Sequence, residues 1–166
     1  MFAGFVRIFD RVVTGLATLG GALAAVALLA ILALVGTEVV LRELFDRSTL
    51  VADEMSAYLN VALVYLGLAY TLREGGFIRV EPVYDRIAHR AGGLVNWIVL
   101  LVSLVYLAVV IWYMVRHARH SFDADIRSLF VSQTPLFWPQ MLIPIGSAIL
   151  ALQLVALALR RVPKLP

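Results

Sequence analysis

Long stretches of the chain contain no Asp, Glu, Lys or Arg, and they cover residues 12–37, 55–72, 91–115 and 128–159. An α-helix needs about 20 consecutive apolar residues to cross the hydrocarbon core of a bilayer. The pattern therefore predicts an all-α integral membrane protein with four transmembrane helices. The expected spans are approximately residues 15–41, 52–73, 93–115 and 137–159, within a single membrane domain that occupies residues 1–166.

In two shorter segments, approximately 2–13 and 81–91, apolar residues recur with the period of a helix and charged residues lie between them. In the second segment Val83, Ile87 and Ala91 recur every four residues, while arginines occupy another face. A short helix with this pattern lies in the membrane interface with its apolar face toward the acyl chains. We expect each segment to form an amphipathic interfacial helix that leads into a span.

The first span is rich in small residues. Ala17, Gly21 and Ala25 recur every four positions beside Gly20 and Ala24. Small residues at this spacing allow two helix backbones to approach closely, so this face predicts a packing seam. An alternative is that glycine and alanine are simply frequent in membrane helices.

Composition supports a membrane protein and excludes several kinds of site. The chain is 62% hydrophobic and 15% charged, against about 25% charged residues in soluble domains. There is no cysteine, which excludes disulfides, thiolate metal ligands and a cysteine nucleophile. The middle of each span lacks an ionisable side chain, whereas secondary transporters place polar groups near the midplane. The sequence therefore predicts no catalytic, substrate-binding or metal site, and a protein that serves a partner.

Lysine and arginine are distributed unevenly between the two sides. The N-terminal segment, the second connection and the C-terminal segment carry nine of them, and the other two connections carry five. Cytoplasmic segments are enriched in these residues. Both termini are therefore expected in the cytoplasm.

The charged residues near the span ends are the candidate contact residues. Glu38 and Arg42 are four residues apart, in the order that favours a helical ion pair. The pair either extends the first helix near the headgroups or contacts another subunit. Asp53 and Glu54 open the second span, where carboxylates meet the positive end of the helix dipole and where Ser48 or Thr49 is expected to cap the helix.

The polar residues near the span ends allow two other interpretations, a catalytic or cation site and a metal or haem site. Adjacent carboxylates such as Asp53 and Glu54 also occur in acid/base or divalent-cation sites, but neighbours on a helix diverge by about 100° and do not converge by themselves. His117 and His120 lie in the third connection among charged residues, which favours a solvated segment over a metal site. No histidine lies mid-span, so the pattern of a bis-histidine membrane haem is missing.

The second connection carries a strip of arginines expected to face the cytoplasm. These either meet anionic lipid headgroups or form a docking surface for a partner subunit. The strip consists of Arg73, Arg79, Arg86 and Arg90.

The stretch from Val40 to Ile87 contains an ordered set of residues: Arg42, Ser48, Asp53, Glu54, Gly67, Arg73, Ile78, Arg79 and Val80. In this order they resemble the pattern of the small membrane subunit, of DctQ type, of tripartite ATP-independent periplasmic (TRAP) transporters. Phe77 and Val51 depart from that pattern, where histidine and tryptophan are usual, and Glu81 replaces an aspartate.

The resemblance implies a noncatalytic subunit in the cytoplasmic (inner) membrane of a bacterium or archaeon. Its expected partners are membrane lipids, a large multi-span subunit that holds the substrate and sodium sites, and a periplasmic binding protein that delivers an organic anion. The small subunit would scaffold the large one during sodium symport, and it would bind no cofactor and no nucleic acid. The alternatives are a membrane anchor of a respiratory electron-transfer complex and a self-associating membrane enzyme or scaffold.

The sequence thus assigns interface or lipid-contact roles rather than catalytic ones. Replacing Arg42 or Glu54 is expected to weaken complex assembly or transport without preventing membrane insertion. The full set of candidates is Glu38, Arg42, Asp53, Glu54, Arg73, Arg79, Arg86 and Arg90.

Overall fold

The computed structural model describes the backbone of residues 2–76 and 81–159, and the side chains of residues 4, 6–76 and 97–159. The described chain is helical apart from its connections and contains no strand, only an isolated bridge between Arg127 and Pro135. The helices are α1 (Phe2–Phe45), α2 (Ala52–Arg73), α3 (Glu81–Asp123) and α4 (Phe137–Leu159).

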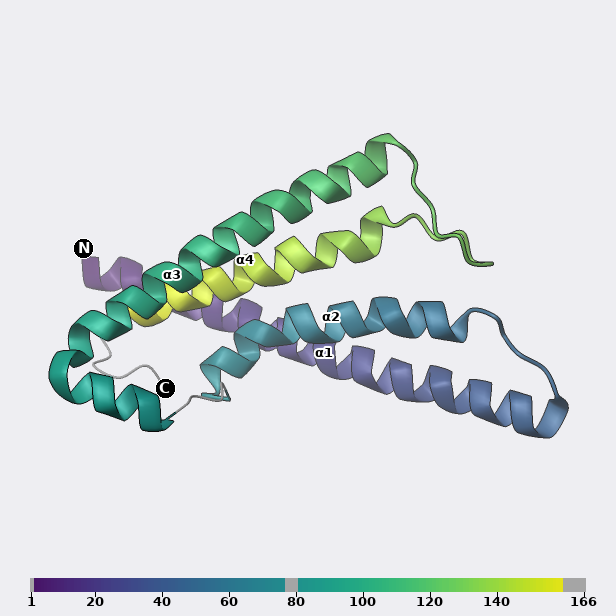
Figure 1. Ribbon diagram of the computed structural model, residues 1–166, viewed down its shortest axis with the longest axis horizontal. Helices are drawn as coiled ribbons and strands as arrows, with labels where there is room; N and C mark the ends of the chain where they lie inside the picture. The colour runs from purple at the N-terminus through teal and green to yellow at the C-terminus, as the bar shows by residue number, and fades with distance from the viewer. Residues whose placement is uncertain (1, 77–80, 160–166) are drawn as a thin grey trace.

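All four helices are long and apolar enough to cross a membrane. The bounds of α2 and α4 coincide with the ranges expected for the second and fourth spans, while α1 and α3 extend beyond theirs. Segments 2–13 and 81–91 are the first parts of α1 and α3, and Figure 1 shows the first part of α3 bent sharply away from the rest of that helix. Pro82 occupies the first turn of α3, where its missing N–H costs nothing.

The helices form two antiparallel pairs, the α1–α2 hairpin and the α3–α4 hairpin (Figure 1). Helix α4 is central because it packs against α1, α2 and α3. Within the described residues, α3 packs against no helix except α4. One hairpin therefore depends on α4 for its attachment to the other.

The α1 seam is made of small residues spaced alternately four and three apart. Val13, Ala17, Gly20, Ala24 and Ala27 are buried in this order. That spacing keeps one stripe facing a partner helix in left-handed packing. The predicted seam is therefore present but rotated, because Ala25 is exposed and Ala27 is buried instead.

Glycines allow close backbone contact at two helix crossings. A methyl group on Gly20 would lie 2.5 Å from the carbonyl oxygen of Leu66 on α2. A methyl group on Gly146 of α4 would overlap the backbone carbonyl of Tyr65. At these crossings only glycine permits the observed approach of α2 to its neighbours.

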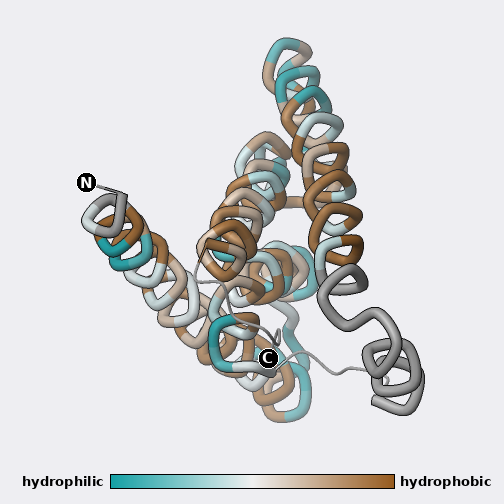
Figure 2. Tube along the Cα trace, turned by 90° about the vertical axis from the view of Figure 1, so that its left-hand side faces the viewer, coloured by the Kyte–Doolittle hydropathy of each residue, from teal (hydrophilic) through white to brown (hydrophobic). Residues whose placement is uncertain are grey.

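Large apolar side chains cover the outside of the bundle. Leu19, Leu29 and Leu32 on α1 are more than half exposed, as are Leu101 and Val102 on α3. Figure 2 shows hydrophobic residues, in brown, along the lengths of the helices. Such a surface is stable in hydrocarbon, which confirms the expected all-α membrane fold.

Candidate functional site

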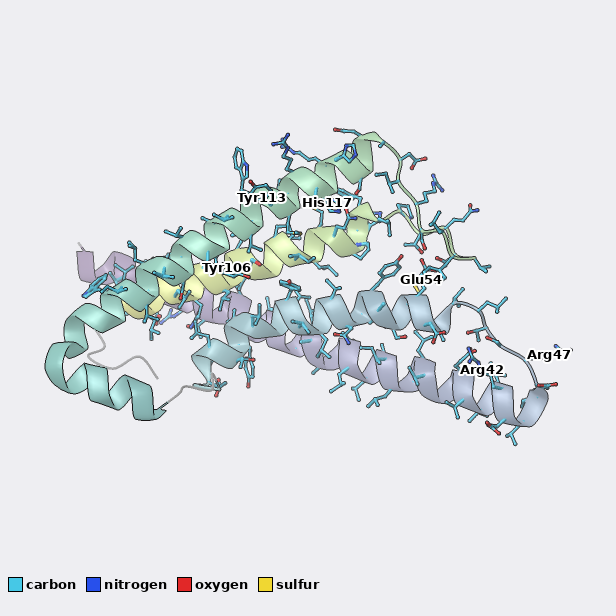
Figure 3. All side chains as sticks on the ribbon, in the orientation of Figure 1. Arg42, Arg47, Glu54, Tyr106, Tyr113 and His117 are labelled. Carbon is cyan, nitrogen blue, oxygen red and sulfur yellow. The ribbon has the colours of Figure 1, made fainter. Side chains whose placement is uncertain are left out.

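Two buried carboxylates lie at the end of the bundle where α1 ends and α2 begins. Glu38, on α1, is 5% exposed, and Glu54, in the first turn of α2, is also 5% exposed. A buried carboxylate requires hydrogen-bond donors to compensate for lost hydration. The partners of each carboxylate therefore show what holds this end together. Figure 3 labels Glu54, near the start of α2, and Arg42, near the end of α1.

Glu38 gathers donors from its own helix and from the α1–α2 connection. Its Oε1 accepts from Arg42 Nε at 2.7 Å and from the Ser48 hydroxyl at 2.5 Å. Its Oε2 accepts from the Thr49 backbone N–H at 3.0 Å and from the Thr49 hydroxyl. The ion pair expected between Glu38 and Arg42 is present, and the carboxylate also fixes the connection.

Ser48 and Thr49 do not cap α2, contrary to the expectation from the sequence. Val51 occupies the N-cap position and makes no side-chain cap hydrogen bond. The two hydroxyls serve Glu38 instead, because the backbone turns back toward α1 before α2 begins. Asp46 and Leu50 adopt positive φ values of 51° and 61° in this turn.

Arg42 reaches from α1 toward the start of α2. Its Nη2 lies 3.4 Å from the Ser48 hydroxyl and 3.9 Å from Oδ2 of Asp53. The arginine side chain is 55% exposed and that of Asp53 is 92% exposed. An ion pair between such exposed groups contributes little to stability, so both groups remain accessible to another molecule.

Glu54 connects the two hairpins. Its Oε1 accepts from the Tyr58 hydroxyl at 2.7 Å, one turn along α2, and its Oε2 accepts from the Ser132 hydroxyl at 2.6 Å. Ser132 belongs to the connection between α3 and α4. In the described chain, no cation lies within ion-pair distance of Glu54, so hydroxyl groups alone satisfy it.

The α3–α4 connection is itself ordered by hydrogen bonds. The Ser128 N–H donates to the Thr134 carbonyl at 2.9 Å, and the Leu136 N–H donates to the Ile126 carbonyl at 3.1 Å. The Ser132 hydroxyl also lies 2.7 Å from that of Thr134. The tip projects outward, with exposed side chains at Leu129, Phe130 and Val131.

Asp53 and Glu54 diverge as their helical positions predict. Asp53 points into solvent and Glu54 is buried between α2 and the α3–α4 connection. Within the described residues, no group of three or more His, Asp or Glu side chains is arranged to hold a metal ion. His117 and His120, expected in a connecting segment, lie in the last turns of α3, which continues to Asp123.

Of the arginine strip, the described side chains include only that of Arg73. Its Nη1 donates to the Thr18 hydroxyl at 2.6 Å, and its Nε lies 3.6 Å from the Glu74 carboxylate. This arginine therefore ties the end of α2 to α1. Arg79 lies outside the described residues, and for Arg86 and Arg90 only the backbone, in α3, is described.

Several polar residues in these contacts were not identified from the sequence. Tyr58 follows Glu54 by four positions, and that helical spacing is a signal that sequence reasoning overlooked. Ser132 lies 78 residues from Glu54, and no local pattern indicates their contact. Gln153 of α4 is 4% exposed, and its side-chain oxygen accepts no hydrogen bond in the described structure.

The sequence can be compared with those of known protein families. The model of the DctQ component of tripartite ATP-independent periplasmic transporters matches residues 31–164. The chain belongs to the DctQ family. The match includes both buried carboxylates, all of α2 and α4, and the central part of the bundle.

The DctQ chain is thus a small membrane component of a TRAP transporter. As a family, DctQ components associate with a large membrane subunit and a periplasmic binding protein. Neither the curated proteins nor the solved structures gave a match to this chain. The DctQ family is a noncatalytic transporter family, in keeping with carboxylates that bind hydroxyl groups of their own chain.

Proposed function

We propose that this DctQ chain is a noncatalytic scaffold that braces the large subunit of a TRAP transporter. The proposal is supported most directly by the hydrogen-bond partners of the two buried carboxylates of this chain. Glu38 and Glu54 are occupied by donors from their own chain, and the stretches at the centre of the spans contain no ionisable residue. Transport chemistry then belongs to the partner.

The proposed complex takes up an organic anion by sodium symport, with the anion delivered by a periplasmic binding protein. Family membership supports this assignment, and the sodium and substrate sites lie on the large subunit. In the proposed orientation the chain spans the inner membrane with both termini in the cytoplasm. The end with Glu38 and Glu54 then faces the periplasm. The excess of Lys and Arg in the N-terminal, second and C-terminal segments supports that orientation.

Among the candidate residues, Arg42 and Asp53 are the proposed periplasmic contacts because their side chains are exposed at the edge of an ordered connection. Glu38 and Glu54 act indirectly, by holding the two connections in place. Arg73 joins α2 to α1, and Arg79, Arg86 and Arg90 are proposed to contact cytoplasmic lipid headgroups or the partner.

Co-expression with the large subunit tests the proposal. A tag on the DctQ chain should recover a much larger polytopic protein after gentle detergent extraction, and the two together with the binding protein should restore uptake. Arg42→Gln should lower recovery and uptake without preventing insertion. Arg47→Gln is the matched control, because that exposed arginine lies in the same connection and makes no ion pair in the described structure.

Recovery of the chain only as a homo-oligomer would contradict the scaffold assignment. A haem Soret band in the purified complex would instead favour a respiratory anchor. Uptake that is equal for Arg42→Gln and Arg47→Gln would remove Arg42 from the proposed contacts while leaving the scaffold role intact.

A further inference from the structure

Helix α3 has a polar stripe that its own bundle does not cover. It packs only against α4 among the described helices, through buried positions such as Leu100, Leu107 and Ala118. Away from that seam, Tyr106 and Tyr113 are 66% and 62% exposed. They are one heptad apart on the same side of the helix, and Figure 3 shows them in succession along α3 with His117.

Tyr106 lies at the depth of the hydrocarbon core. It is nine residues after Trp97 and nine before Val115, the last residue of the charge-free stretch, and each separation corresponds to about 14 Å of helix. Tyrosines near the ends of spans place their hydroxyl groups among lipid headgroups. The Tyr106 side chain is too far from either end of the stretch for that arrangement.

The Tyr106 hydroxyl makes no hydrogen bond to any described residue, and neither does that of Tyr113. Lipid tails offer no acceptor, so the exposed Tyr106 phenol would remain unsatisfied in lipid, whereas Tyr113, two residues before Val115, is close enough to the end of the stretch to reach the headgroups. The outer face of α1 differs, because its exposed residues are aliphatic, as at Leu19, Leu23 and Val26. The α1 face suits lipid, and the α3 face requires a polar partner.

We propose that the tyrosine stripe of α3, formed by Tyr106, Tyr113 and His117, packs against a transmembrane helix of the large subunit. That helix presents a side-chain carbonyl or carboxylate acceptor to the Tyr106 phenol. This inference rests on the proposed scaffold function and adds the face through which the scaffold makes contact. Acceptors at this depth must belong to a protein within the same bilayer, which excludes the periplasmic binding protein.

Charge favours the large subunit over a second copy of this chain. Arg116 and Arg119 are exposed near the end of the stripe and lie beside His117 and His120. In the described structure, neither arginine has a carboxylate within ion-pair distance. Two parallel copies would bring these like charges together, whereas a partner with acidic residues at this level would neutralise them.

Photocrosslinking from the stripe tests the proposed contact. The chain has no cysteine, so a single Val109→Cys substitution places a benzophenone maleimide between the two tyrosines, at a position that is 50% exposed. Leu23→Cys is the matched control on the outer face of α1, at 55% exposed and near the middle of its charge-free stretch. Both variants are to be irradiated in membranes that contain the co-expressed large subunit.

The Val109 probe should form an adduct with the large subunit in severalfold excess over the Leu23 probe. An adduct between two copies of the chain would overturn the proposal. The proposal would also be overturned if the large subunit co-purified with the chain but formed an adduct only with the Leu23 probe. That result would not contradict the scaffold function. Failure of the wild-type chain to recover the large subunit would overturn both.

Removing the Tyr106 hydroxyl gives an independent measurement. Tyr106→Phe should lower the recovery of the large subunit in detergent by roughly 2- to 10-fold, the effect of one lost hydrogen bond. The thermal unfolding of the isolated chain should not change, because this hydroxyl bonds to nothing within its described part. Tyr70→Phe, on α2, is the control and should recover the full amount. Undiminished recovery with Tyr106→Phe would contradict the proposed hydrogen bond.

Discussion

At the scale of single residues, Glu54 joins α2 to the α3–α4 connection, two parts of the chain that are far apart in sequence. Its oxygens accept hydrogen bonds from Tyr58 on α2 and from Ser132 in the α3–α4 connection. Because no described cation neutralises it, each hydroxyl donor carries a large share of its stabilisation. Loss of one donor removes a hydrogen bond from a buried carboxylate, which is more costly than loss of an exposed hydrogen bond.

We therefore expect Ser132→Ala to lower the thermal unfolding midpoint of the chain in detergent by roughly 2–4 °C. Ser56→Ala is the control, since the Ser56 hydroxyl bonds to the Ala52 carbonyl of its own helix. Circular dichroism during heating measures both variants. Equal midpoints for the two would show that the contact between Ser132 and Glu54 does not stabilise the bundle.

At the scale of the helices, α4 holds the molecule together by close approach. Gly146 lets its backbone touch that of α2 at Tyr65, and the adjacent Ser147 is 1% exposed. Pro144, two residues before Gly146, is also buried within the helix. Small or compact residues at this crossing replace the interdigitating leucines that a soluble bundle would use.

Gly146→Ala should destabilise the chain by about 1–3 kcal/mol, because the added methyl group must displace the backbone of α2. Gly15→Ala provides the control, because nothing lies within 4 Å of a methyl group at that position. The control should be neutral or stabilising, since alanine favours a helix over glycine. Equilibrium unfolding in mixed detergent micelles measures both, and equal stability of the two variants would contradict the close crossing.

At the scale of the whole molecule, two hairpins meet along α4 and are linked again at one end by Glu54 and Ser132. That end carries the ordered connections and the exposed tip at Leu129 and Phe130. In the proposed orientation the tip faces the periplasm, and the end that contains Arg73 and Glu74 faces the cytoplasm.

Labelling of single cysteines tests this orientation. In intact cells with a permeabilised outer membrane, Leu129→Cys should react with a maleimide that does not cross the inner membrane. Glu74→Cys, which is also exposed, should react only after the inner membrane is opened. The asymmetry of Lys and Arg is the physical reason for this expectation. The opposite labelling pattern would reverse the proposed topology.

Much of this architecture follows from local sequence patterns. The bounds of α2 and α4 follow from apolar runs, and they agree with the predicted ranges. The ion pair between Glu38 and Arg42 follows from their four-residue spacing and was also predicted. The seam on α1 was predicted only in part, because Ala25 and Ala27 are equally small and the orientation of the helix is set by its neighbours.

The contacts that organise the carboxylates were much less predictable. Ser48 has the residue type and position of a helix cap, yet it donates to Glu38, because a buried carboxylate requires donors more strongly than an exposed helix start. The bond between Ser132 and Glu54 depends on how two hairpins pack. No periodic pattern in a single sequence indicates a contact between residues that are 78 positions apart.

The central place of α4 has a consequence for biosynthesis. The ribosome completes the α1–α2 hairpin first and α3 next, but the helix that joins them is the last of these four to be made. Until α4 enters the membrane, α3 has no described helix of its own chain to pack against. Messages truncated before α4 should therefore yield an inserted product whose third helix is unpaired.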